Sequence, residues 1–478
     1  MQPVATVAEV RAADAAALTQ VCQSVLVTRA GTAVARAALG MLGGGYGRRV
    51  VVVAGKGNNG ADGRVAASLL TRRGALVRVV DATDPGPLDR CDLVIDAAYG
   101  TGFKGSYDAP LVPSGALVLA VDVPSGVNAD TGAAPGTPMP ATRTVSFAAF
   151  KPGLLQGDGA RLAGQVEVAD IGVAVDTPGI GLIEDADVTG HLARRDPDAH
   201  KWASAVAIVA GSPGMEGSAA LSARGASHAG AGMVRLAVPG ADGPDGSGGA
   251  GPWPLEAVRL GLPGEGWAGQ VLEVLERCRA LVVGPGLGRT EATQAEIRRV
   301  IAESPVPVVA DADALFALGD AAQAREVVTA AVHPVILTPH DGEYQGLAGR
   351  PPGPDRVSAA RDLAERCGAV VLLKGSLTAL AAPATVPAGD LPGVLLAAAG
   401  TSRLATAGTG DVLSGIIGAM VARGLPVLMA GALGAHVHGR ASGLGHGEGL
   451  VAGDLPGLVA DWLSEAMGAT HGGDGGHG

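Results

Sequence analysis

The sequence predicts an α/β protein with two domains, each built on a largely parallel β-sheet that helices cover. Three observations predict this fold class. The chain has 478 residues, about three times the ~150 residues of a typical domain. Short runs of aliphatic residues alternate with helix-length segments along most of the chain. Aromatic residues make up only 3%, so Val, Ile, Leu and Ala must fill the core, as is typical of buried parallel strands.

Four apolar runs in the first half predict the strands of a parallel sheet. They lie at residues 49–54, 76–81, 92–96 and 116–122, and the last three end in aspartate. A helix is expected over residues 62–73, because Gly74 follows it where a C-cap glycine is typical. The Ala-rich segment 7–39 predicts two further helices that pack on this sheet.

The strand pattern stops between residues 172 and 200, so we place the domain boundary near residue 195. Six later runs predict a second sheet, at residues 204–210, 233–238, 280–283, 307–310, 335–338 and 369–373. The expected domains are therefore 1–194 and 195–470. A mobile loop is expected at 239–266, which is rich in Gly, Pro and Asp, and a flexible Gly/His tail at 471–478.

Charge and cysteine usage narrow the class of protein. With 35 basic and 46 acidic residues, a net charge of −11 and no basic block, neither a nucleic acid nor a membrane is an expected partner. The N-terminus lacks the basic and apolar regions of a signal peptide, and the longest apolar stretch, 411–433, contains Arg423. Four widely spaced cysteines fit reduced thiols in a cytoplasmic protein.

The segment GKGNNG at residues 55–60 follows a predicted strand and opens a helix. Its glycine spacing, with Asp81 at the end of the next strand, fits a dinucleotide-binding turn. Asn58, Asn59 and Asp62 suit a cation or a polar ligand better than a pyrophosphate, so both interpretations stay open. A Walker loop is excluded, because Lys56 precedes the asparagines instead of following a final glycine.

Two neighbouring strand ends carry further polar residues. Asp96 precedes a Gly-Thr-Gly turn whose free N–H groups suit phosphate, and Asp122 precedes Ser125 at the next strand end. Because ligands of parallel sheets bind beyond the carboxyl ends of the strands, the three turns together predict one site.

The motifs GKGNNGADG, DAAYGTGF and VDVPSG resemble those of the NAD(P)H-hydrate epimerase family over residues 1 to about 190. The resemblance implies a Rossmann-like three-layer domain and a potassium ion held by Asn59, Asp96 and Ser125. It also implies that the residues around the hydrated nicotinamide nucleotide are Asn58, Asn59, Gly60, Ala61, Asp62, Gly100, Thr101, Gly102, Phe103, Lys104, Gly105, Ser106 and Asp122.

Asp122 is the expected catalytic residue of this first site. Hydrated NADH carries a hydroxyl on the carbon next to the ring nitrogen, so this stereocentre can lose and regain hydroxide through an iminium. A carboxylate beside that carbon would stabilise the cation and shuttle the proton.

In the second half, the segment Gly-Thr-Gly-Asp at residues 408–411 opens an apolar helix. Its glycines leave N–H groups free at the positive end of the helix, which predicts an anion hole, and Asp411 beside it suits a base for phosphoryl transfer. Lys374 follows a predicted strand and suits a nucleotide phosphate. His340, also after a strand, suits a role in positioning a ligand or moving a proton, whereas His436 and His438 are expected in the core or on a helix surface.

The motifs GPGLG, DADAL, LTPHDGE, LKGSLT and ATAGTGDVLSG resemble the ADP-dependent NAD(P)H-hydrate dehydratases of the ribokinase-like fold, from about residue 195 to 465. The resemblance implies that ADP contacts Lys374, Gly375, Ser376, Leu377, Thr378 and Gly410. It implies that the hydrate contacts Ser218, Gly286, His340 and Asp411. Magnesium is expected alongside ADP, and Asp411 is the expected base for phosphoryl transfer to the C6 hydroxyl, after which phosphate leaves.

Together the two halves predict a bifunctional repair enzyme for hydrated nicotinamide coenzymes. Its isomerase half interconverts R- and S-NAD(P)H-hydrate, and its lyase half dehydrates the S form to NAD(P)H at the expense of ADP. A vitamin-precursor type of small-molecule kinase shares the second fold but leaves the first half without a role. A nucleotide sensor without activity has no need of Asp411 beside an anion hole. Family resemblance also implies a homo-oligomer.

Overall fold

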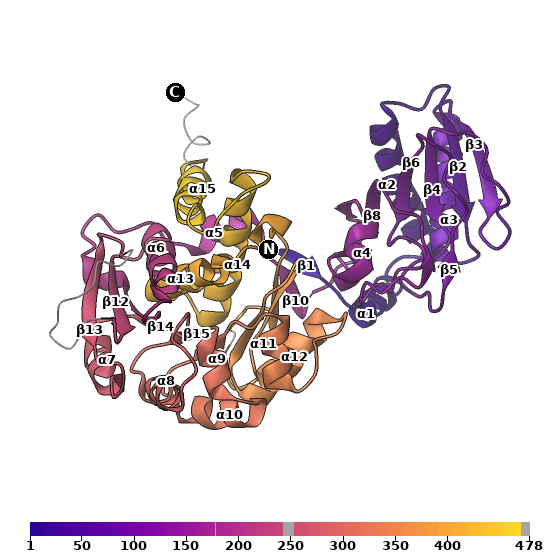
Figure 1. Ribbon diagram of the computed structural model, residues 1–478. Coiled ribbons are helices and arrows are strands. Elements are labelled where there is room, and N and C mark those ends of the chain that lie inside the picture. The colour runs from indigo at the N-terminus through magenta and orange to yellow at the C-terminus, as the bar shows by residue number, and fades with distance from the viewer. Residues whose placement is uncertain (177, 242–252, 388, 470–478) are drawn as a thin grey trace. The chain divides into compact units, whose positions relative to one another are not determined.

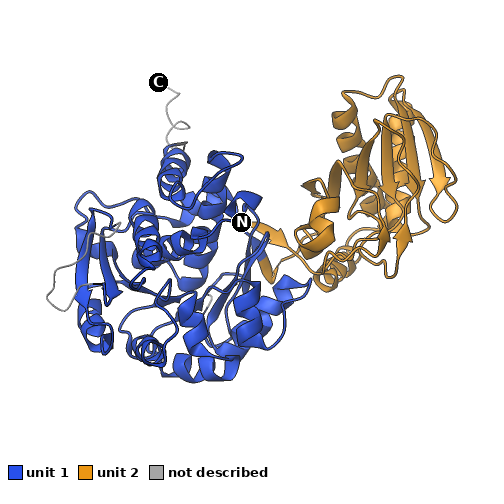
Figure 2. Ribbon diagram, viewed as in Figure 1, with its two compact units in different colours: residues 1, 181–478 blue, residues 2–180 orange. Residues whose placement is uncertain are grey.

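The structure is a computed structural model that describes residues 1–176, 178–241, 253–387 and 389–469 (Figure 1). The chain divides into two compact units (Figure 2): unit 2 is Gln2–Ile180, and unit 1 is Gly181–Gly478 together with Met1. Each unit has its own sheet, wholly parallel in unit 2 and largely parallel in unit 1, and its own hydrophobic core.

The sheet of unit 2 has six described strands, all parallel, in the order β3-β2-β4-β6-β8-β9. Their bounds are β2 Arg49–Ala54, β3 Leu76–Asp81, β4 Leu93–Ala97, β6 Leu117–Val121, β8 Arg143–Phe147 and β9 Gln165–Ala169. The first four confirm the predicted strands, and β8 and β9 extend the sheet beyond them. Three short strands complete the unit: β1 Gln2–Val4, β5 Tyr107–Asp108 and β7 Gly136–Thr137.

Helices α2 and α3 cover one face of this sheet and share a core with β2, β4, β6 and β8 (Figure 1). The helices of the unit are α1 Val7–Ala17, α2 Gln23–Leu42, α3 Asn58–Arg72 and α4 Gly157–Leu162, with a short 3-10 helix at Pro152–Leu154. The two covering helices approach closely because Gly31 has no side chain: a Cβ there would lie 2.5 Å from the Cβ of Val65.

Among the described residues, α2 alone is long and apolar enough to span a membrane by length and composition. Half of that apolar window is buried in unit 2. Leu26, Val34 and Leu42 of this helix belong to the core that α2 and α3 share with the sheet. The apolar face of α2 therefore packs within the protein.

The sheet of unit 1 contains the strands β19-β18-β17-β16-β15-β14-β11-β12-β13 in that order. All neighbours are parallel except β18, which is antiparallel to both β17 and β19. The bounds are β10 Ile180–Leu182, β11 Ala205–Val209, β12 Met233–Pro239, β13 Ala257–Leu262, β14 Ala280–Val283, β15 Val308–Ala310, β16 Val335–Leu337, β17 Val370–Leu373, β18 Thr378–Ala381 and β19 Val394–Ala397.

Helices lie on both faces of this second sheet (Figure 1). One face carries α6 Glu216–His228, α13 Thr409–Ala422 and α14 Val427–Leu444, joined in one core with α5 Asp185–His191 and α15 Leu455–Ala469. The other helices are α7 Ala268–Leu275, α8 Glu291–Glu303, α9 Asp313–Leu318, α10 Ala321–Ala330, α11 Asp341–Ala348 and α12 Arg356–Cys367. Two 3-10 turns lie at Lys201–Ser204 and Ser402–Leu404.

The structure confirms the six strands predicted for the second half and differs from the sequence analysis elsewhere. The segment expected to be a loop at 239–266 contains β13, which pairs in parallel with β12. Residues 242–252 of this segment lie outside the described part. Helix α3 begins at Asn58, before the expected start at residue 62.

The division between the units falls at residues 180 and 181, ahead of the expected boundary at 195, because α5 packs against α14 and α15 within unit 1. As the limits of two domains with separate activities, 1–194 and 195–470 stay a prediction. The expected flexible tail, 471–478, lies outside the described residues.

Candidate active sites

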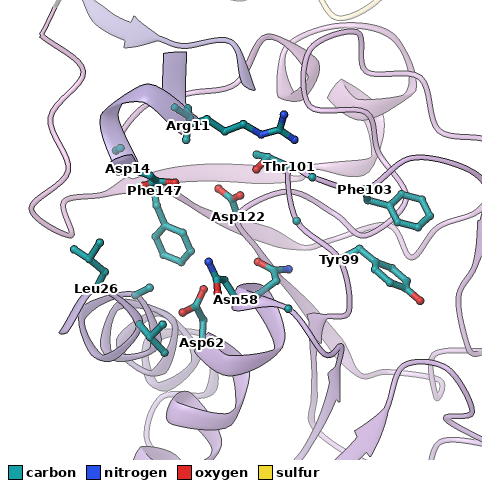
Figure 3. Close-up of a pocket in the computed structure, with 18 of the residues that line it drawn as sticks. Arg11, Asp14, Leu26, Asn58, Asp62, Tyr99, Thr101, Phe103, Asp122 and Phe147 are labelled. Carbon is teal, nitrogen blue, oxygen red and sulfur yellow. The ribbon is translucent and has the colours of Figure 1, made fainter. Parts of the chain in front are cut away.

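A cavity of about 810 Å³ lies at the carboxyl ends of β2, β4 and β6 in unit 2 (Figure 3). The predicted residues that line it are Asn58, Asn59, Asp62, Gly100, Thr101, Gly102, Phe103, Lys104 and Asp122. Gly60, Ala61, Gly105 and Ser106 are not among its lining residues. The single site that was predicted from three strand ends is therefore one physical cavity.

The glycine loop does not behave as a dinucleotide-binding turn. Such a turn would direct Asp81 at a ribose, but Asp81 does not line the cavity. Its carboxylate instead accepts hydrogen bonds from the backbone N–H and the hydroxyl of Thr83, at 2.8 and 2.6 Å. The alternative interpretation is that the polar residues at the start of α3 bind a cation or a polar ligand. Asn58, Asn59 and Asp62 all line the cavity, which agrees with this interpretation.

Asp122 is held in a strained backbone conformation and by an ion pair. Its φ angle is +67°, a left-handed conformation that costs a non-glycine residue free energy and is concentrated at functional sites. The Lys151 ammonium donates to Asp122 Oδ1 at 2.6 Å. The same ammonium donates to Ser146 Oγ at 2.9 Å and to the Phe147 carbonyl at 2.8 Å, and the lysine side chain is 1% exposed. The buried lysine thus fixes the carboxylate in place.

Sequence reasoning missed Lys151. It follows β8, a strand that the sequence analysis did not predict, and its only sequence signal is a lysine just after a strand-like run that ends at Phe147. Its pairing with Asp122 joins two segments 29 residues apart.

Two further carboxyl groups, Asp62 of α3 and Asp14 of α1, face the same cavity (Figure 3). Burial, followed by the nearby charges of Asp122 and Asp14, raises the pKa of Asp62 to about 8. Burial and Asp122 also raise the pKa of Asp14, while Lys151 acts to lower it. Three carboxyl groups, those of Asp14, Asp62 and Asp122, therefore line one cavity.

Asn59 and Gly100 shape the space around Asp122. A Cβ on Gly100 would lie 3.2 Å from Asn59 Oδ1 and 3.5 Å from Asp122 Oδ2, so only glycine leaves these oxygens open to a ligand. The Asn59 amide donates to the Val121 carbonyl at 3.1 Å, and Asn58 Oδ1 accepts from Gln23 Nε2 at 2.8 Å.

Of the three residues expected to hold potassium, Asp96 and Ser125 contact each other, whereas Asn59 lies in the lining of the cavity. Asp96 is fully buried, and its Oδ2 accepts the backbone N–H of Ser125 at 2.9 Å. Burial raises the pKa of Asp96, although hydrogen bonds from Ser125 oppose this. The Ser125 hydroxyl contacts the backbone of Tyr99. Asn59 lines the cavity, whereas Asp96 and Ser125 lie outside its lining.

The second site, in unit 1, is organised around Lys374. Its ammonium lies 2.8 Å from Asp311 Oδ1 and 3.6 Å from Glu343 Oε2. The other Asp311 oxygen accepts the Ser414 hydroxyl at 2.6 Å. Burial acts to raise the pKa of Asp311, but Lys374 and these hydrogen bonds hold it below its ordinary value. Burial acts to lower the pKa of Lys374, and the two carboxylates raise it.

A strained turn after β15 directs two acids in different directions. Ala312, between Asp311 and Asp313, has a φ of +51°. Asp313 accepts the Gly288 N–H at 2.9 Å and Arg289 Nε at 2.7 Å, so it fixes the loop after β14. Only glycine fits at position 284 in that loop, because a Cβ there would lie 1.8 Å from the Asp311 carbonyl oxygen.

The segment that was predicted to form an anion hole lies at the N-terminus of α13. Gly408 is the N-cap in a left-handed conformation with φ +87°. A Cβ on Gly410 would lie 3.7 Å from the Lys374 ammonium and 3.9 Å from Asp311 Oδ2, so this helix N-terminus lies beside the lysine. Burial raises the pKa of Asp411, in the same turn, to about 6, and a hydrogen bond with Ser218 acts to lower it.

The remaining predicted residues surround this centre. Ser218 lies against Gly286: a Cβ built on Gly286 would lie 3.1 Å from the Ser218 hydroxyl. His340 caps α11: its Nδ1 accepts the Gly342 N–H at 2.9 Å, its side chain is 60% exposed, and Glu343 lies between it and Lys374.

The segment 374–378 consists of the turn between β17 and β18 and the first residue of β18, Thr378. Arg356, which sequence reasoning missed, donates to the carbonyls of Lys374 and Leu377, and Gly375 packs against its guanidinium. Leu377 is only 1% exposed, and its carbonyl already accepts from Arg356. His436 and His438 are buried in α14, where His436 Nε2 lies 2.7 Å from Asp185 Oδ1.

The fold and sites define a class: a Rossmann-like unit joined to a ribokinase-like unit, each with an acidic site at the carboxyl ends of its strands. A family model described as NAD(P)H-hydrate dehydratase matches residues 206–463, and one described as YjeF-related protein N-terminus matches 23–90 and 81–153. A solved ribokinase-like superfamily protein from Enterococcus faecalis shares the fold of 60% of this chain and 96% of its own, with a TM-score of 0.50 at 18% identity.

Relatives over most of the chain identify the family. A bifunctional NAD(P)H-hydrate repair enzyme from Moorella thermoacetica is 37% identical over 455 residues, 82% of each chain. One from Mycobacterium leprae is 36% identical over 471 residues, 92% of this chain and 93% of that one. The chain belongs to the family of bifunctional NAD(P)H-hydrate repair enzymes.

Proposed function

We propose that the chain repairs hydrated nicotinamide coenzymes in two reactions. Unit 2 interconverts R- and S-NAD(P)H-hydrate, and unit 1 dehydrates the S form to NAD(P)H at the expense of ADP. The observation that carries the proposal is the presence of two separate centres in one chain: Asp122 with Lys151, and Asp411 beside the Lys374 anion hole. Similarity to bifunctional repair enzymes over 82% of the chain supports the pairing.

In unit 2, Asp122 is the residue that faces the reacting carbon. When the hydrate loses its C6 hydroxyl, positive charge spreads over C6 and the ring nitrogen. The Asp122 carboxylate, held by Lys151 at 2.6 Å, is a fixed negative charge that stabilises this cation. The cavity of about 810 Å³ is large enough for the nicotinamide end of a coenzyme.

Potassium fits the buried carboxylate of Asp96. In the described structure no ammonium or guanidinium pairs with Asp96, and an unpaired buried carboxylate is costly. We propose that Asp96, Ser125 and Asn59 hold a potassium ion, as the resemblance implies. When bound, the ion supplies positive charge that keeps this loop arrangement stable beside the cavity.

In unit 1, we assign Asp411 the role of base. The C6 hydroxyl of the S-hydrate attacks the β-phosphorus of ADP, its proton passes to Asp411, and AMP leaves. The C6–O bond then breaks with its electron pair going to phosphate, a far better leaving group than hydroxide, and loss of a C5 proton restores the dihydropyridine. A base with a pKa of about 6 is ionised at neutral pH and can accept that proton.

The nucleotide would lie against Lys374 and the anion hole. We propose that Lys374 and Gly410 contact the phosphates, and that the turn formed by Gly375, Ser376, Leu377 and Thr378 contacts the rest of ADP. Gly286, Ser218 and His340 remain the proposed contacts of the hydrate. No group of three or more His, Cys, Asp or Glu side chains in the described residues forms a metal site, so magnesium would be held mainly by the diphosphate and water.

A vitamin-precursor kinase is the alternative function, and it gives the cavity of unit 2 no role. Incubation of the full chain with S-hydrated NADH and ADP, followed by the absorbance of regenerated NADH, decides between them. Regeneration supports the proposal; a stable phosphorylated alcohol from another substrate would favour the kinase. A homo-oligomer and a cytoplasmic location are also proposed, on the resemblance and the composition respectively.

Variants assign the two reactions to the two units. Asp122→Asn should leave dehydration of the S-hydrate intact and prevent use of the pure R-hydrate beyond its spontaneous epimerisation. Asp411→Asn should prevent NADH formation from both forms while R and S still interconvert. Loss of both activities in either variant would contradict the division of labour.

A further inference from the structure

Asp62 has a different environment from Asp122, although both line the same cavity. The Asp62 side chain lies in the first turns of α3 and is 6% exposed. Among the described residues, no hydrogen bond or ion pair involves its carboxyl group, whereas Asp122 accepts directly from an ammonium. A buried carboxyl group without a donor or a cation is stable only when it carries a proton.

The charged groups around Asp62 favour the protonated form as well. Two other carboxyl groups face it, Asp14 from α1 and Asp122 from the end of β6, and Lys151 is already bound to Asp122. The other cations that line the cavity are Arg11, Lys56 and Lys104. With its pKa raised to about 8 by burial and by the two carboxyl groups, Asp62 keeps its proton at pH 7.

Two carboxyl groups whose surroundings favour opposite protonation states are the arrangement that separates an acid from a base in one site. Figure 3 shows Asp62 rising from α3 and Asp122 entering from a different element, with the Phe147 ring beside them. Epimerisation needs both functions, because one proton must be given to the departing hydroxyl and another taken from the water that returns.

We propose that Asp62 is a second catalytic residue of unit 2, which donates a proton to the hydroxyl that leaves the hydrate, while Asp122 accepts the proton of the water that adds. This inference rests on the proposed epimerase function. It assigns to Asp62 a chemical step, where resemblance implied only that it lines the substrate.

The step balances as follows. The C6–O bond breaks, its electron pair stays on oxygen, and the oxygen takes the Asp62 proton and departs as water. The lone pair of N1 forms the C6=N1 bond of the iminium. Water then adds to C6 from the other face, and its surplus proton passes to Asp122. Exchange with solvent, or the reverse reaction, returns Asp62 to its protonated state.

The test uses the full chain and three variants. Asp62→Asn keeps the shape and removes the proton, and we expect epimerisation of R-hydrate to fall by about 10²–10⁴-fold, the usual contribution of a general acid. Asp62→Glu should recover part of this loss. Loss of ¹⁸O from labelled C6 hydroxyl reports C–O cleavage directly and should fall by the same factor. Binding of the hydrate to Asp62→Asn should change less than about tenfold, because a 1.4 kcal/mol difference covers one hydrogen bond.

The pH profile gives a readout that a structural role would not produce. Epimerisation by the wild type should decline as pH rises through about 8, since Asp62 loses its proton there. Asp14→Asn removes a carboxylate that raises this pKa, so the decline should move to lower pH. A wild-type rate that stays constant from pH 7 to pH 10 would overturn the proposal.

Dehydration of S-hydrate by unit 1 serves as an internal control for the amount of active chain, and thermal unfolding of each variant reports whether unit 2, which contains Asp62 and Asp14, is folded. Wild-type chain that fails to epimerise would refute the epimerase function itself. If the wild type epimerises and Asp62→Asn epimerises equally fast, only the acid role of Asp62 is refuted. The same conclusion follows if Asp62→Asn fails only because it has lost affinity for the hydrate.

Discussion

The ammonium of Lys374 lies 2.8 Å from Asp311 Oδ1, and this buried pair links three elements of unit 1. Asp311 follows β15, Lys374 follows β17, and the second oxygen of Asp311 accepts the hydroxyl of Ser414 in α13. The Lys374 side chain is 19% exposed and that of Asp311 is 2% exposed. The carboxylate therefore binds the ammonium from the buried side, and the opposite side of the ammonium faces the N-terminus of α13.

Asp311→Asn should therefore weaken nucleotide use without removing any proposed contact to ADP. The loss of one partner leaves Lys374 with only Glu343 at 3.6 Å, and breaking a buried pair typically costs about 3–5 kcal/mol of stability. We expect KM for ADP to rise more than tenfold and the melting temperature to fall. Steady-state kinetics and thermal unfolding measure both. Glu326→Gln, an exposed acid of α10, is the matched control; equal behaviour of the two variants would contradict the role of Asp311.

Lys151→Met should disable unit 2 while sparing unit 1. Methionine fills much the same buried volume, but Asp122 loses the ammonium at 2.6 Å that orients it. Consumption of pure R-hydrate should then fall to its spontaneous rate, while S-hydrate is dehydrated at the wild-type rate. An assay of NADH formation from each epimer distinguishes the two, and undiminished use of R-hydrate would exclude Lys151 from the site.

Asp62→Asn should make unit 2 more stable at neutral pH. The pKa of Asp62 is raised from 3.8 to about 8 in the folded state. Between these two pH values, ionisation of Asp62 stabilises the unfolded chain but not the folded chain, so the free energy of unfolding is reduced. That penalty is absent below pH 3.8 and grows until about pH 8; at pH 7 its removal should add roughly 2–4 kcal/mol to the free energy of unfolding. Unfolding of the variant at pH 3.5 and pH 7 tests this, with the exposed Asp84→Asn as control. A variant with no gain at pH 7 would show that Asp62 is already ionised.

The dehydratase rate should rise with pH through about 6. Asp411 acts as a base only when it has lost its proton, and burial raises its pKa to about 6. The Ser218 hydrogen bond acts to lower that value, so Ser218→Ala should move the rising limb to higher pH. Profiles of kcat for S-hydrate with saturating ADP give the midpoint. A limb that does not move in Ser218→Ala would separate Ser218 from Asp411.

Replacement of potassium by a bulky organic cation should slow epimerisation and leave dehydration unchanged. A buried carboxylate such as Asp96 would then lose its proposed counter-ion. Asp96→Asn should remove most of the difference between the two salts. The rates of R-to-S conversion at equal ionic strength in both salts check this, and identical rates in the wild type would exclude a potassium role.

The sequence predicted the parts of both sites that come from local patterns. Asp122 and Asp411 stand directly after an apolar run or a glycine turn, and a parallel sheet brings such ends together, so their places in the fold follow from spacing. The partners that orient them come from elsewhere in the chain. Lys151 pairs with Asp122 across 29 residues, and Lys374 pairs with Asp311 across 63.

Three of the strands that the sequence analysis missed, β8, β9 and β13, lack a continuous buried apolar run. The strand β8 contains Arg143, Thr144 and Ser146, and β9 is only partly buried, so neither reads as a continuous apolar run. The strand β13 lies at the edge of its sheet with mostly half-exposed residues, inside a segment otherwise rich in glycine and proline. Most of the strands that the sequence predicted are buried runs of apolar residues, because sheet interiors demand apolar residues on both faces. Burial alone did not decide the outcome, since the buried strands β18 and β19 were missed as well.

The division of one polypeptide into two compact units has a consequence for the supply of each activity. A ribosome that finishes this chain delivers both catalysts in equal number, whatever the level of expression. If each unit works as proposed, no imbalance in synthesis lets the unusable R epimer of the damaged coenzyme accumulate because the epimerase is scarce.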